Sequence, residues 1–297
     1  MTYGKQMTWN KIMINASILG TITKKIGSMK SNRDARNIAD HFTKFLQPQI
    51  ADCPELIDEV FRIRHNVYCE ELSFEEVRAN GKESDEFDEH SIFTLIKHKP
   101  SNTFTSCVRL VSSNGPEQLL PIEKYCLGSI TNKEFSPERF NRTEIAEISR
   151  LSVKSNFRRR KTDNYKGSET GAISEYIYSK EELRCFPFIA IGLYIAAATM
   201  GINTGIKHVY VMMEPRLARR MKFIGIIFHQ LGEPVNYHGL RAPYYINAET
   251  FMTSLSPELK ILVKTIEKDL NKQLNQLKTS YFIRKNTKVS EKCLNNY

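Results

Sequence analysis

The sequence lacks the features that mark several large classes of protein. It contains no CxxC pair, and its six cysteines stand singly, as is typical of reduced thiols rather than of a disulfide framework. No apolar run is both long enough and uncharged enough to span a bilayer. The first 20 residues have neither a clean apolar core nor a small-residue cleavage site, so we predict no secretory signal. We expect a cytoplasmic protein that could, at most, contact the inner membrane peripherally.

The motifs of covalent catalysis and metal binding are also missing. There is no GxSxG elbow and no Cys–His pair in a suggestive context, which argues against a covalent enzyme intermediate. The acidic run Glu83–Glu89 is followed by His90, but its spacing is not that of a known calcium loop. We therefore expect neither a bound metal nor a permanently bound cofactor.

Charge of both signs is present but unevenly placed. The net charge is +10, yet residues 51–100 carry six basic and thirteen acidic side chains. Residues 1–50 carry eight basic and two acidic side chains, and residues 251–297 carry nine and four. Basic ends of this kind could meet an acidic protein, an anionic membrane or nucleic acid, or serve solubility alone. We predict a basic N-terminal extension (1–45), a central domain (46–250) and a basic helical C-terminal extension (251–297).

Hydrophobic periodicity predicts a mixed order of helices and strands in the central domain. A helix is predicted from Asp52 to about Glu71, followed by a hairpin of strands Ser91–Lys97 and Thr105–Ser112. Further strands are predicted at 144–153, 206–213, 226–231 and 244–246, and helices at 188–200, 215–223 and from Pro257 onward. This order favours an α/β fold with a mixed sheet and helices on both faces, in which strands 144–153 and 206–213 are parallel neighbours.

Two charged residues fall where a core is expected. Arg64 shares a helical stripe with Ile57, Phe61 and Tyr68, so its guanidinium must either reach solvent or find a buried acceptor. Glu147 lies in the middle of a strand whose two faces are both largely apolar. Burial would raise the pKa of that carboxyl unless a cation lies close, which is how a general base is made. The alternative is a buried ion pair between Glu147 and one of the arginines.

This set of charged and aromatic residues resembles the acyl-homoserine lactone synthases. Their early helix carries an Arg followed by aromatics four and ten residues later, usually Phe and Trp. An acidic motif, an Arg on the next strands and a Glu-x-Ser-Arg strand motif follow in that order. The order and approximate spacing agree with this sequence across residues 53–155. The matching residues are Arg64, Tyr68, Phe74, Glu83, Asp85, Asp88, Arg109, Glu147, Ser149 and Arg150.

The later part of the sequence departs from those synthases. The segments Glu214–Arg219 and Tyr237–Pro243 look more like the related N-acyl amino acid synthases, and closest to the acyltransferases of PEP-CTERM/exosortase systems. The resemblance covers about residues 45–250. It implies a GNAT-like fold, a three-layer αβα sandwich whose central mixed sheet splays at two parallel strands. It also implies that the phosphopantetheine arm of an acyl thioester lies in the resulting cleft.

The resemblance further implies a donor, either an acyl carrier protein or coenzyme A. GNAT enzymes that use coenzyme A commonly hold its pyrophosphate on a glycine-rich loop after the central strand, because glycine permits close backbone approach. Here that place has no glycine and reads Arg158, Arg159, Arg160 and Lys161 after Phe157. These cations could face the acidic surface of a carrier protein, or form a solvated basic turn. We favour the carrier protein as donor.

We therefore predict an N-acyltransferase that moves a fatty-acyl chain to the amine of an amino acid or similar small acceptor. Glu147 would accept the amine proton, Ser149 would donate a hydrogen bond or pack, and Arg150 would complete the catalytic group. The remaining matched residues would form an ion network that shapes the acceptor side: Arg64, Tyr68, Phe74, Glu83, Asp85, Asp88 and Arg109. One alternative is an acyl-homoserine lactone synthase. Another is a non-enzymatic module that binds an acyl carrier or nucleic acid, although we expect no nucleic acid partner.

Overall fold

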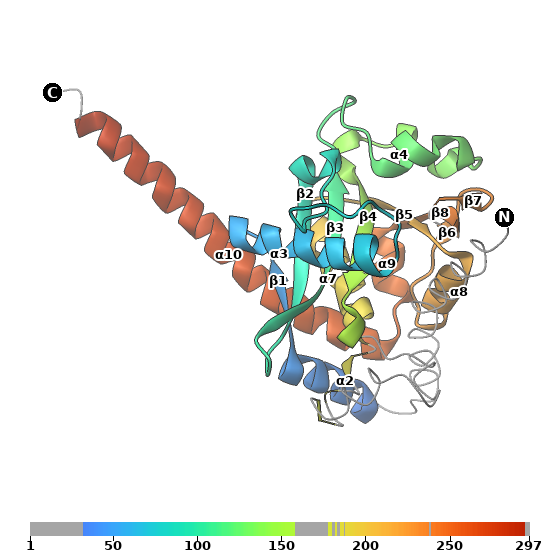
Figure 1. Ribbon diagram of the computed structural model, residues 1–297, viewed down its shortest axis with the longest axis horizontal. Helices are drawn as coiled ribbons and strands as arrows, with labels where there is room; N and C mark the ends of the chain where they lie inside the picture. Colours follow the sequence, from blue (N-terminus) through green and yellow to red (C-terminus); the bar gives the residue numbers. More distant parts are fainter. Residues whose placement is uncertain are drawn as a thin grey trace.

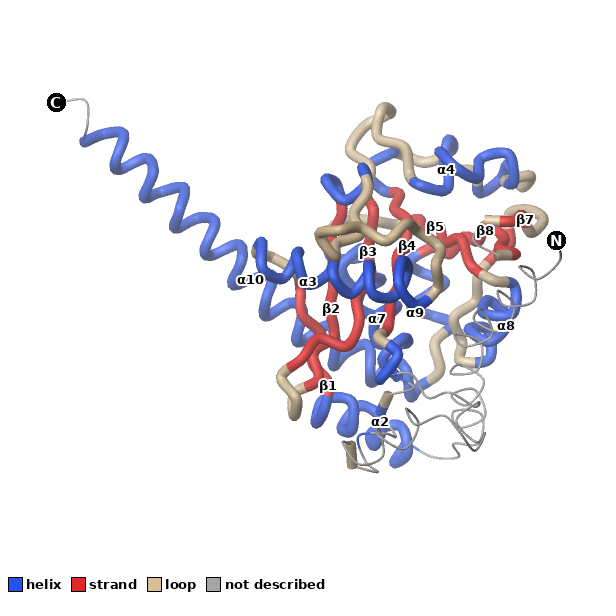
Figure 2. Tube along the Cα trace, viewed as in Figure 1, coloured by secondary structure: helices blue, strands red, loops and turns tan. Residues whose placement is uncertain are grey.

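The computed structural model describes residues 32–157, 178–179, 182, 185–186, 188–237 and 239–294 (Figures 1 and 2). The strands are β1 (Leu46–Ile50), β2 (Ser91–His98), β3 (Thr103–Ser112), β4 (Ile145–Val153), β5 (His208–Met213), β6 (His229–Gln230), β7 (Val235–Asn236) and β8 (Leu240–Asn247). The α-helices are α2 (Asn32–Phe45), α3 (Pro54–Arg64), α4 (Pro121–Cys126), α7 (Phe188–Asn203), α8 (Pro215–Phe223), α9 (Ala248–Ser254) and α10 (Pro257–Leu294). A π-helix, η1 (His65–Glu71), continues α3. Short 3-10 helices are η2 (Glu86–His90), η3 (Leu127–Ser129), η4 (Lys133–Phe135), η5 (Pro137–Arg139), η6 (Arg142–Glu144) and η7 (Ser155–Phe157).

The strands form one mixed sheet with the order β1-β2-β3-β4-β5-β8-β6, and β7 pairs with β8. The β4–β5 pair is parallel and the other pairs are antiparallel. A parallel pair needs a crossover, and α7 lies within the segment that joins β4 to β5. The predicted mixed sheet and the predicted parallel pair are confirmed.

The parallel pair is short, and this opens the sheet. β4 and β5 pair only from Ile145–Glu147 to His208–Tyr210. Beyond that point β4 stays with β3 and β5 stays with β8, so the two strands diverge toward their carboxyl ends. Ligands of open α/β sheets bind at the carboxyl ends of strands where the topology changes direction. The predicted splay is confirmed, and it places residues 147–151 opposite residues 211–214.

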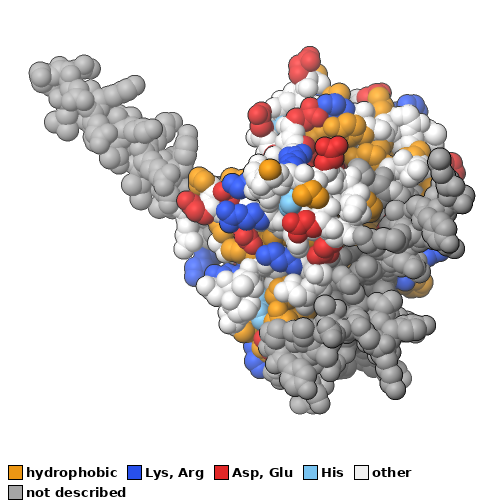
Figure 3. All heavy atoms as spheres, viewed as in Figure 1, with side chains coloured by type: hydrophobic (Ala, Val, Ile, Leu, Met, Phe, Trp, Pro, Cys, Tyr) orange, Lys and Arg blue, Asp and Glu red, His pale blue; other side chains and the backbone are white. Residues whose placement is uncertain are grey.

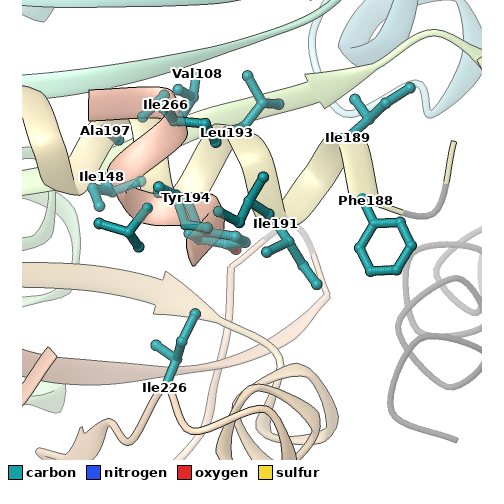
Figure 4. Close-up of a cluster of buried hydrophobic side chains, with 14 of the residues drawn as sticks. Val108, Ile148, Phe188, Ile189, Ile191, Leu193, Tyr194, Ala197, Ile226 and Ile266 are labelled. Carbon is teal, nitrogen blue, oxygen red and sulfur yellow. The ribbon is translucent and has the colours of Figure 1, made fainter. Parts of the chain in front are cut away.

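Helices cover both faces of the sheet (Figure 1). Alternate residues of β3 face opposite layers, since Val108 packs in the cluster of α7 whereas Cys107 packs with Val60 and Ile63 of α3. Helix α7 is apolar around most of its circumference, as expected for a helix enclosed between the sheet and other helices (Figure 4). The three-layer arrangement expected of a GNAT-like sandwich is therefore present.

Helix α2 and the first half of α10 pack on the α7 face. Gly192 of α7 permits this close approach, since a Cβ there would lie 2.7 Å from the ring of Phe42 in α2. The first half of α10 buries an apolar stripe in the same core, consisting of Leu259, Leu262, Val263, Ile266 and Leu270. Its second half extends away from the body (Figure 1). The division at residues 45 and 250 stays a prediction.

The helix predicted to run to Glu71 is α-helical only as far as Arg64. From His65 the backbone is a π-helix, a form that often occurs at functional sites. The wider turn changes the spacing of the side chains that follow the buried arginine. Within the described residues, no helix has both the length and the apolar character needed to cross a membrane.

Candidate active site

A cavity of about 380 Å³ lies where β4 and β5 diverge. Glu147, Ser149 and Arg150 of β4 form one wall, and residues 211–213 of β5 with Glu214 directly after it form the opposite wall. Further lining comes from η1 and the loop after it, from α4, from α7, from Tyr237 before β8 and from Arg241 in β8. Eight of the predicted site residues line this cavity: Tyr68, Phe74, Glu83, Asp85, Arg109, Glu147, Ser149 and Arg150. Arg64 and Asp88 lie behind it, bonded to residues that do.

Arg64 anchors the buried end of an ion network. Its side chain is fully buried, and its Nε donates to Glu83 at 2.5 Å while Nη1 donates to Asp88 at 2.7 Å. Glu83 is itself fully buried in the loop that follows η1. Burying charges is costly, so such a group persists only when its partners compensate it closely. The core arginine of the sequence pattern therefore has buried acceptors and does not reach solvent.

Arg109 joins this network to β4, the strand that carries Glu147. It stands directly opposite Ser149 in the β3–β4 register, and its Nε donates to the Ser149 Oγ at 3.0 Å. Its Nη1 contacts both Asp85 and Asp88, the latter at 2.7 Å. These two carboxylates also cap η2 reciprocally, since each accepts a backbone N–H of that turn. The acidic loop is thereby fixed against β3 and β4.

Arg150 is the most exposed of the three arginines in the network. Its Nη2 lies 2.9 Å from Glu75, and 3.3 Å from both Glu83 and Asp85. Its guanidinium also lies over the ring of Tyr68, 5.3 Å from the centroid. Arg150 has φ of 51°, a left-handed conformation that is uncommon in a residue other than glycine. The positive φ turns this side chain toward the cavity instead of along the regular strand.

The backbone at Arg150 belongs to a β-bulge. The register of β3 and β4 shifts between Cys107 and Arg109, so that β4 carries one extra residue there. In a regular strand the side chains alternate between the two faces of the sheet. In β4 the bulge breaks this alternation after Ser149. A bulge leaves one residue outside the ladder, which makes its backbone groups available to a ligand.

Two carboxylates of the network, Glu83 and Asp85, have pKa values below their ordinary values. Burial alone would raise the pKa of Glu83, but the hydrogen bond and charge of Arg64 outweigh it and hold that pKa below its ordinary value. Burial would also raise the pKa of Asp85, but the charge and hydrogen bond of Arg109 outweigh burial, so this pKa is lowered as well. Arg64, Arg109 and Arg150 are thus committed to their acidic partners.

Glu147 behaves in the opposite way. Burial raises the pKa of its carboxyl to about 8, against a weaker lowering by the Ile122 backbone N–H, which donates to Oε2 at 2.6 Å. Among the described residues it makes no ion pair, because Arg64, Arg109 and Arg150 contact Glu75, Glu83, Asp85 and Asp88 instead. Of the two interpretations of this glutamate, the geometry favours a proton acceptor over an ion pair.

Tyr68 and Phe74 form the aromatic side of the cavity. The Tyr68 hydroxyl donates to the Leu151 carbonyl at 3.1 Å, which ties η1 to the bulged strand. The Phe74 ring lies 6.5 Å from the Tyr68 ring, and the Phe74 backbone N–H donates to the Tyr68 carbonyl at 2.8 Å. The two aromatic residues of the sequence pattern therefore lie side by side, at the point where the chain leaves η1.

The molecular surface shown in Figure 3 carries acidic and basic side chains close together, with apolar side chains gathered beside them. Exposed apolar residues include Leu119, Tyr125 and Leu127, in or next to α4. Tyr125 also lines the cavity and stacks on Tyr237 at 6.2 Å between centroids. The cavity wall at α4 is therefore continuous with exposed apolar surface.

Several cavity residues carry no role in the sequence pattern. Glu214, Tyr237 and Arg241 line the cavity and belong to the two segments that resemble the N-acyl amino acid synthases. The sequence does not show that these two segments lie side by side; that follows only from the pairing of β5 with β8.

The predicted carrier-binding residues Arg158, Arg159, Arg160 and Lys161 lie outside the described residues. Over the part of the chain that is described, no His, Cys, Asp and Glu side chains form a group that could hold a metal ion.

Comparison with known proteins agrees with the sheet topology. Residues 63–166 match the family model described as an acetyltransferase (GNAT) domain. The crystal structure of TofI in a ternary complex with an inhibitor and MTA is 16% identical with a TM-score of 0.51, covering 72% of this chain and 99% of its own. The AHL synthase LasI is 16% identical (TM-score 0.48; 71% of this chain and 96% of its own). FeeM, an N-acyl amino acid synthase from uncultured soil microbes, is 14% identical (TM-score 0.46; 71% and 94%).

No curated protein sequence matches this chain. At these identities a structural likeness establishes the fold and nothing finer. The chain has a GNAT-like fold, with a mixed sheet flanked by helices and opened at its parallel pair.

Proposed function

We propose that this protein is an N-acyltransferase that moves a fatty-acyl chain from a phosphopantetheine thioester to the amine of an amino acid or similar small acceptor. The observation that carries the proposal is Glu147, a buried carboxyl without an ion-pair partner among the described residues, in the wall of the cavity between the diverging strands. A pKa near neutrality suits a general base, because such a group can both accept and release a proton at working pH.

The reaction would be a direct transfer without an acyl-enzyme. The acceptor nitrogen attacks the thioester carbonyl carbon, an amide C–N bond forms, and the C–S bond breaks to release the phosphopantetheine thiol. Glu147 takes the proton that the nitrogen loses, directly or through one water, and this proton passes on to the departing sulfur, which leaves as the thiol. Backbone N–H groups at the bulge of β4 would polarise the carbonyl as negative charge develops on its oxygen.

The ion network would hold the acceptor side in shape. Arg64 and Arg109 connect the acidic loop to β3 and, through Ser149, to the strand that carries Glu147. A 1 Å misplacement of a catalytic group can cost about 100-fold in rate. We propose that Arg150, the most exposed arginine of the network and a cavity-lining residue, contacts substrate directly, and that Arg64 and Asp88 act only through their neighbours.

An acyl carrier protein is the donor that we favour, and coenzyme A is the alternative. The sequence after Phe157 has four consecutive cations in place of the glycine-rich turn that a pyrophosphate cradle uses. A second basic surface lies on α8, where Arg216, Arg219 and Lys222 are exposed and Leu217 lines the cavity. Acidic partner surfaces are drawn to such clusters.

The main alternative is an acyl-homoserine lactone synthase, with which the N-terminal half of the pattern agrees equally well. The segments Glu214–Arg219 and Tyr237–Pro243 favour the N-acyl amino acid synthases instead. The association with PEP-CTERM/exosortase systems depends on the same two segments and is part of the proposal. A non-enzymatic binding module would have no use for an unpaired buried glutamate.

The test is a transfer assay with the purified chain. Lauroyl- and palmitoyl-loaded acyl carrier protein, and the matching coenzyme A thioesters, are each incubated with the twenty amino acids or with S-adenosylmethionine. Mass spectrometry then identifies any acylated amine or lactone. An N-acyl amino acid that forms with wild type but not with Glu147→Gln supports the proposal. A lactone as the main product supports the alternative, and binding of the loaded carrier without any product supports the module.

A further inference from the structure

Glu214 and Arg241 adjoin the last residue pair of two antiparallel strands. The β5–β8 register ends with Met213 paired to Ala242; Glu214 follows β5 directly, and Arg241 precedes Ala242 in β8. Both side chains line the cavity between β4 and β5. Opposite charges on neighbouring strands stabilise a sheet when they pair. Here no ion pair or hydrogen bond joins them within the part of the chain that the structure describes.

Arg241 has instead an unused donor. Its guanidinium lies 5.9 Å from the centroid of the Phe74 ring, across the cavity. Its Nε is buried and has no hydrogen-bond partner among the described residues. Of the other arginines of the cavity wall, Arg109 and Arg150 make ion pairs with the acidic loop, and Arg78 donates to the Ser84 carbonyl. The Nε of Arg150 is also buried without a hydrogen-bond partner, but its terminal nitrogen is ion-paired, whereas Arg241 makes no ion pair among the described residues. A buried N–H without an acceptor costs free energy, and a ligand acceptor would remove that cost.

Glu214 is the matching unused acceptor. It precedes the first turn of α8, yet its side chain accepts no capping hydrogen bond there. Burial raises the pKa of this carboxyl, and Arg241 opposes the shift without reversing it. The cavity therefore presents a guanidinium and a carboxyl that make no ion pair among the described residues, Arg241 in β8 and Glu214 directly after β5, next to the wall that carries Glu147.

We propose that Arg241 and Glu214 form an acceptor head-group subsite, in which Arg241 binds the α-carboxylate of the acceptor and Glu214 binds its ammonium group. The proposal rests on the proposed function and names its acceptor class: a zwitterionic α-amino acid head group. Two groups of opposite charge in the wall of one cavity match the two ends of that head group. Arginine is suited to the carboxylate because Nε and a terminal nitrogen can donate to its two oxygens together.

The same head group could come from a free amino acid or from S-adenosylmethionine, since both carry an α-carboxylate beside an α-amine. The subsite would bind each in the same way, with the rest of the molecule extending into the cavity. A simple amine or an amino acid carboxamide lacks the carboxylate. Each would leave the Arg241 Nε without its acceptor, so the enzyme should discriminate against them.

The experiment compares matched acceptors on matched variants. Acceptors are the best amino acid from the transfer assay, its carboxamide, and S-adenosylmethionine. Variants are Arg241→Gln, Arg241→Lys and Glu214→Gln, with Lys207→Gln as the control, because that exposed lysine near the start of β5 is remote from the cavity wall. Steady-state kinetics and calorimetric binding are measured for each pair, so that the head-group contact is tested even if turnover fails.

Arg241→Gln should lower kcat/KM for the amino acid about 10- to 100-fold, mainly through KM, and should leave the carboxamide nearly unchanged. Arg241→Lys should recover part of the loss, because it restores charge without the planar fork. Glu214→Gln should weaken the acid and the carboxamide alike, since both carry the amine. Lys207→Gln should behave as wild type.

Equal effects of Arg241→Gln on the acid and the carboxamide would overturn the subsite, and so would calorimetry in which neither amino acids nor S-adenosylmethionine bind the wild type. Acceptor binding that depends on Arg241 without any acyl transfer would instead leave the subsite in place and overturn the proposed reaction.

Discussion

The Glu147 carboxylate accepts a hydrogen bond from the backbone N–H of Ile122 at 2.6 Å. Ile122 lies in the first turn of α4, so the α4 segment fixes the orientation of a group on β4 that makes no ion pair among the described residues. One oxygen of the carboxylate is used in this contact. The arrangement holds the carboxyl in a buried position without pairing it to a cation, so that it can take up and release a proton as a general base does.

Replacement of this acid by its amide should separate catalysis from folding. Glu147→Gln keeps the size of the side chain, and its amide oxygen can still accept from the Ile122 N–H, but it cannot take a proton. We expect turnover to fall by roughly 100-fold or more. The melting temperature should stay near that of wild type. Near-normal turnover in this variant would show that Glu147 is structural.

The activity should depend on pH through the same group. Burial raises the pKa of Glu147 to about 8, so the carboxyl is mostly protonated at neutral pH and becomes a base as the pH rises through that value. The kcat/KM for acyl transfer should rise accordingly. Because the acceptor amine also titrates, the profile is measured with two acceptors of different amine pKa. The inflection that comes from the acceptor amine should move when the acceptor is changed. An inflection near pH 8 that stays in place with both acceptors belongs to the enzyme.

The same shift predicts a dependence of stability on pH. A carboxyl whose pKa is higher in the folded than in the unfolded chain stabilises the fold below the unfolded value of 4.5, and loses that contribution as the pH rises through about 8. Denaturant unfolding of wild type and Glu147→Gln, compared between pH 5 and pH 9, isolates it. The unfolding free energy of wild type should fall relative to that of Glu147→Gln as the pH rises. A difference that stays constant with pH would contradict the raised pKa.

The fold could be predicted from the sequence because its strongest elements are local. The hairpin of β2 and β3, the strand at β4 and the apolar helix α7 each show a clear hydrophobic period or run. Less was predictable where local signals conflict with tertiary context. β1 contains Pro48, which reads as a breaker, and it is tolerated because β1 lies at the edge of the sheet. The change from α3 to a π-helix at His65 has no signal in the periodicity.

The candidate site could be predicted in part for a similar reason. Arg64 and Glu147 were detectable because charge on an apolar stripe or strand is a local anomaly. Glu214 and Arg241 are unremarkable in their own segments and become a pair only through the β5–β8 register. The bulge at Arg150 depends likewise on the pairing of β3 with β4. A contact between distant segments does not change the hydrophobic periodicity of either segment, so it cannot be predicted from that pattern.

Removal of the buried arginine should test the network. Arg64→Ala leaves Glu83 buried without its hydrogen-bond partner and deprives Asp88 of one, so we expect a loss of about 3–5 kcal/mol in unfolding free energy. Arg62→Ala is the matched control, because Arg62 is exposed on the same helix and should change stability by no more than about 0.5 kcal/mol. Urea unfolding of both variants gives the values. Equal midpoints for Arg64→Ala and wild type would contradict the buried network.

The donor can be identified by charge reversal. If an acyl carrier protein docks on Arg158, Arg159, Arg160 and Lys161, changing all four to Glu should raise the apparent KM for loaded carrier protein. It should do little for an acyl-pantetheine of the same chain length, which has no acidic protein surface to lose. The control reverses four exposed lysines on α10: Lys260, Lys264, Lys268 and Lys272. Both variants change the net charge equally, so a general electrostatic effect would appear in both.

Salt supplies the second criterion, because exposed charge pairs are screened over a Debye length of about 8–10 Å at physiological ionic strength. The advantage of carrier thioesters over coenzyme A thioesters of equal length should therefore shrink as salt rises in wild type, and should already be small in the 158–161 variant. A loss confined to the α10 variant would move the docking site to that helix. Equal use of both donors at every salt concentration would show that coenzyme A suffices, and that the four cations form only a solvated turn.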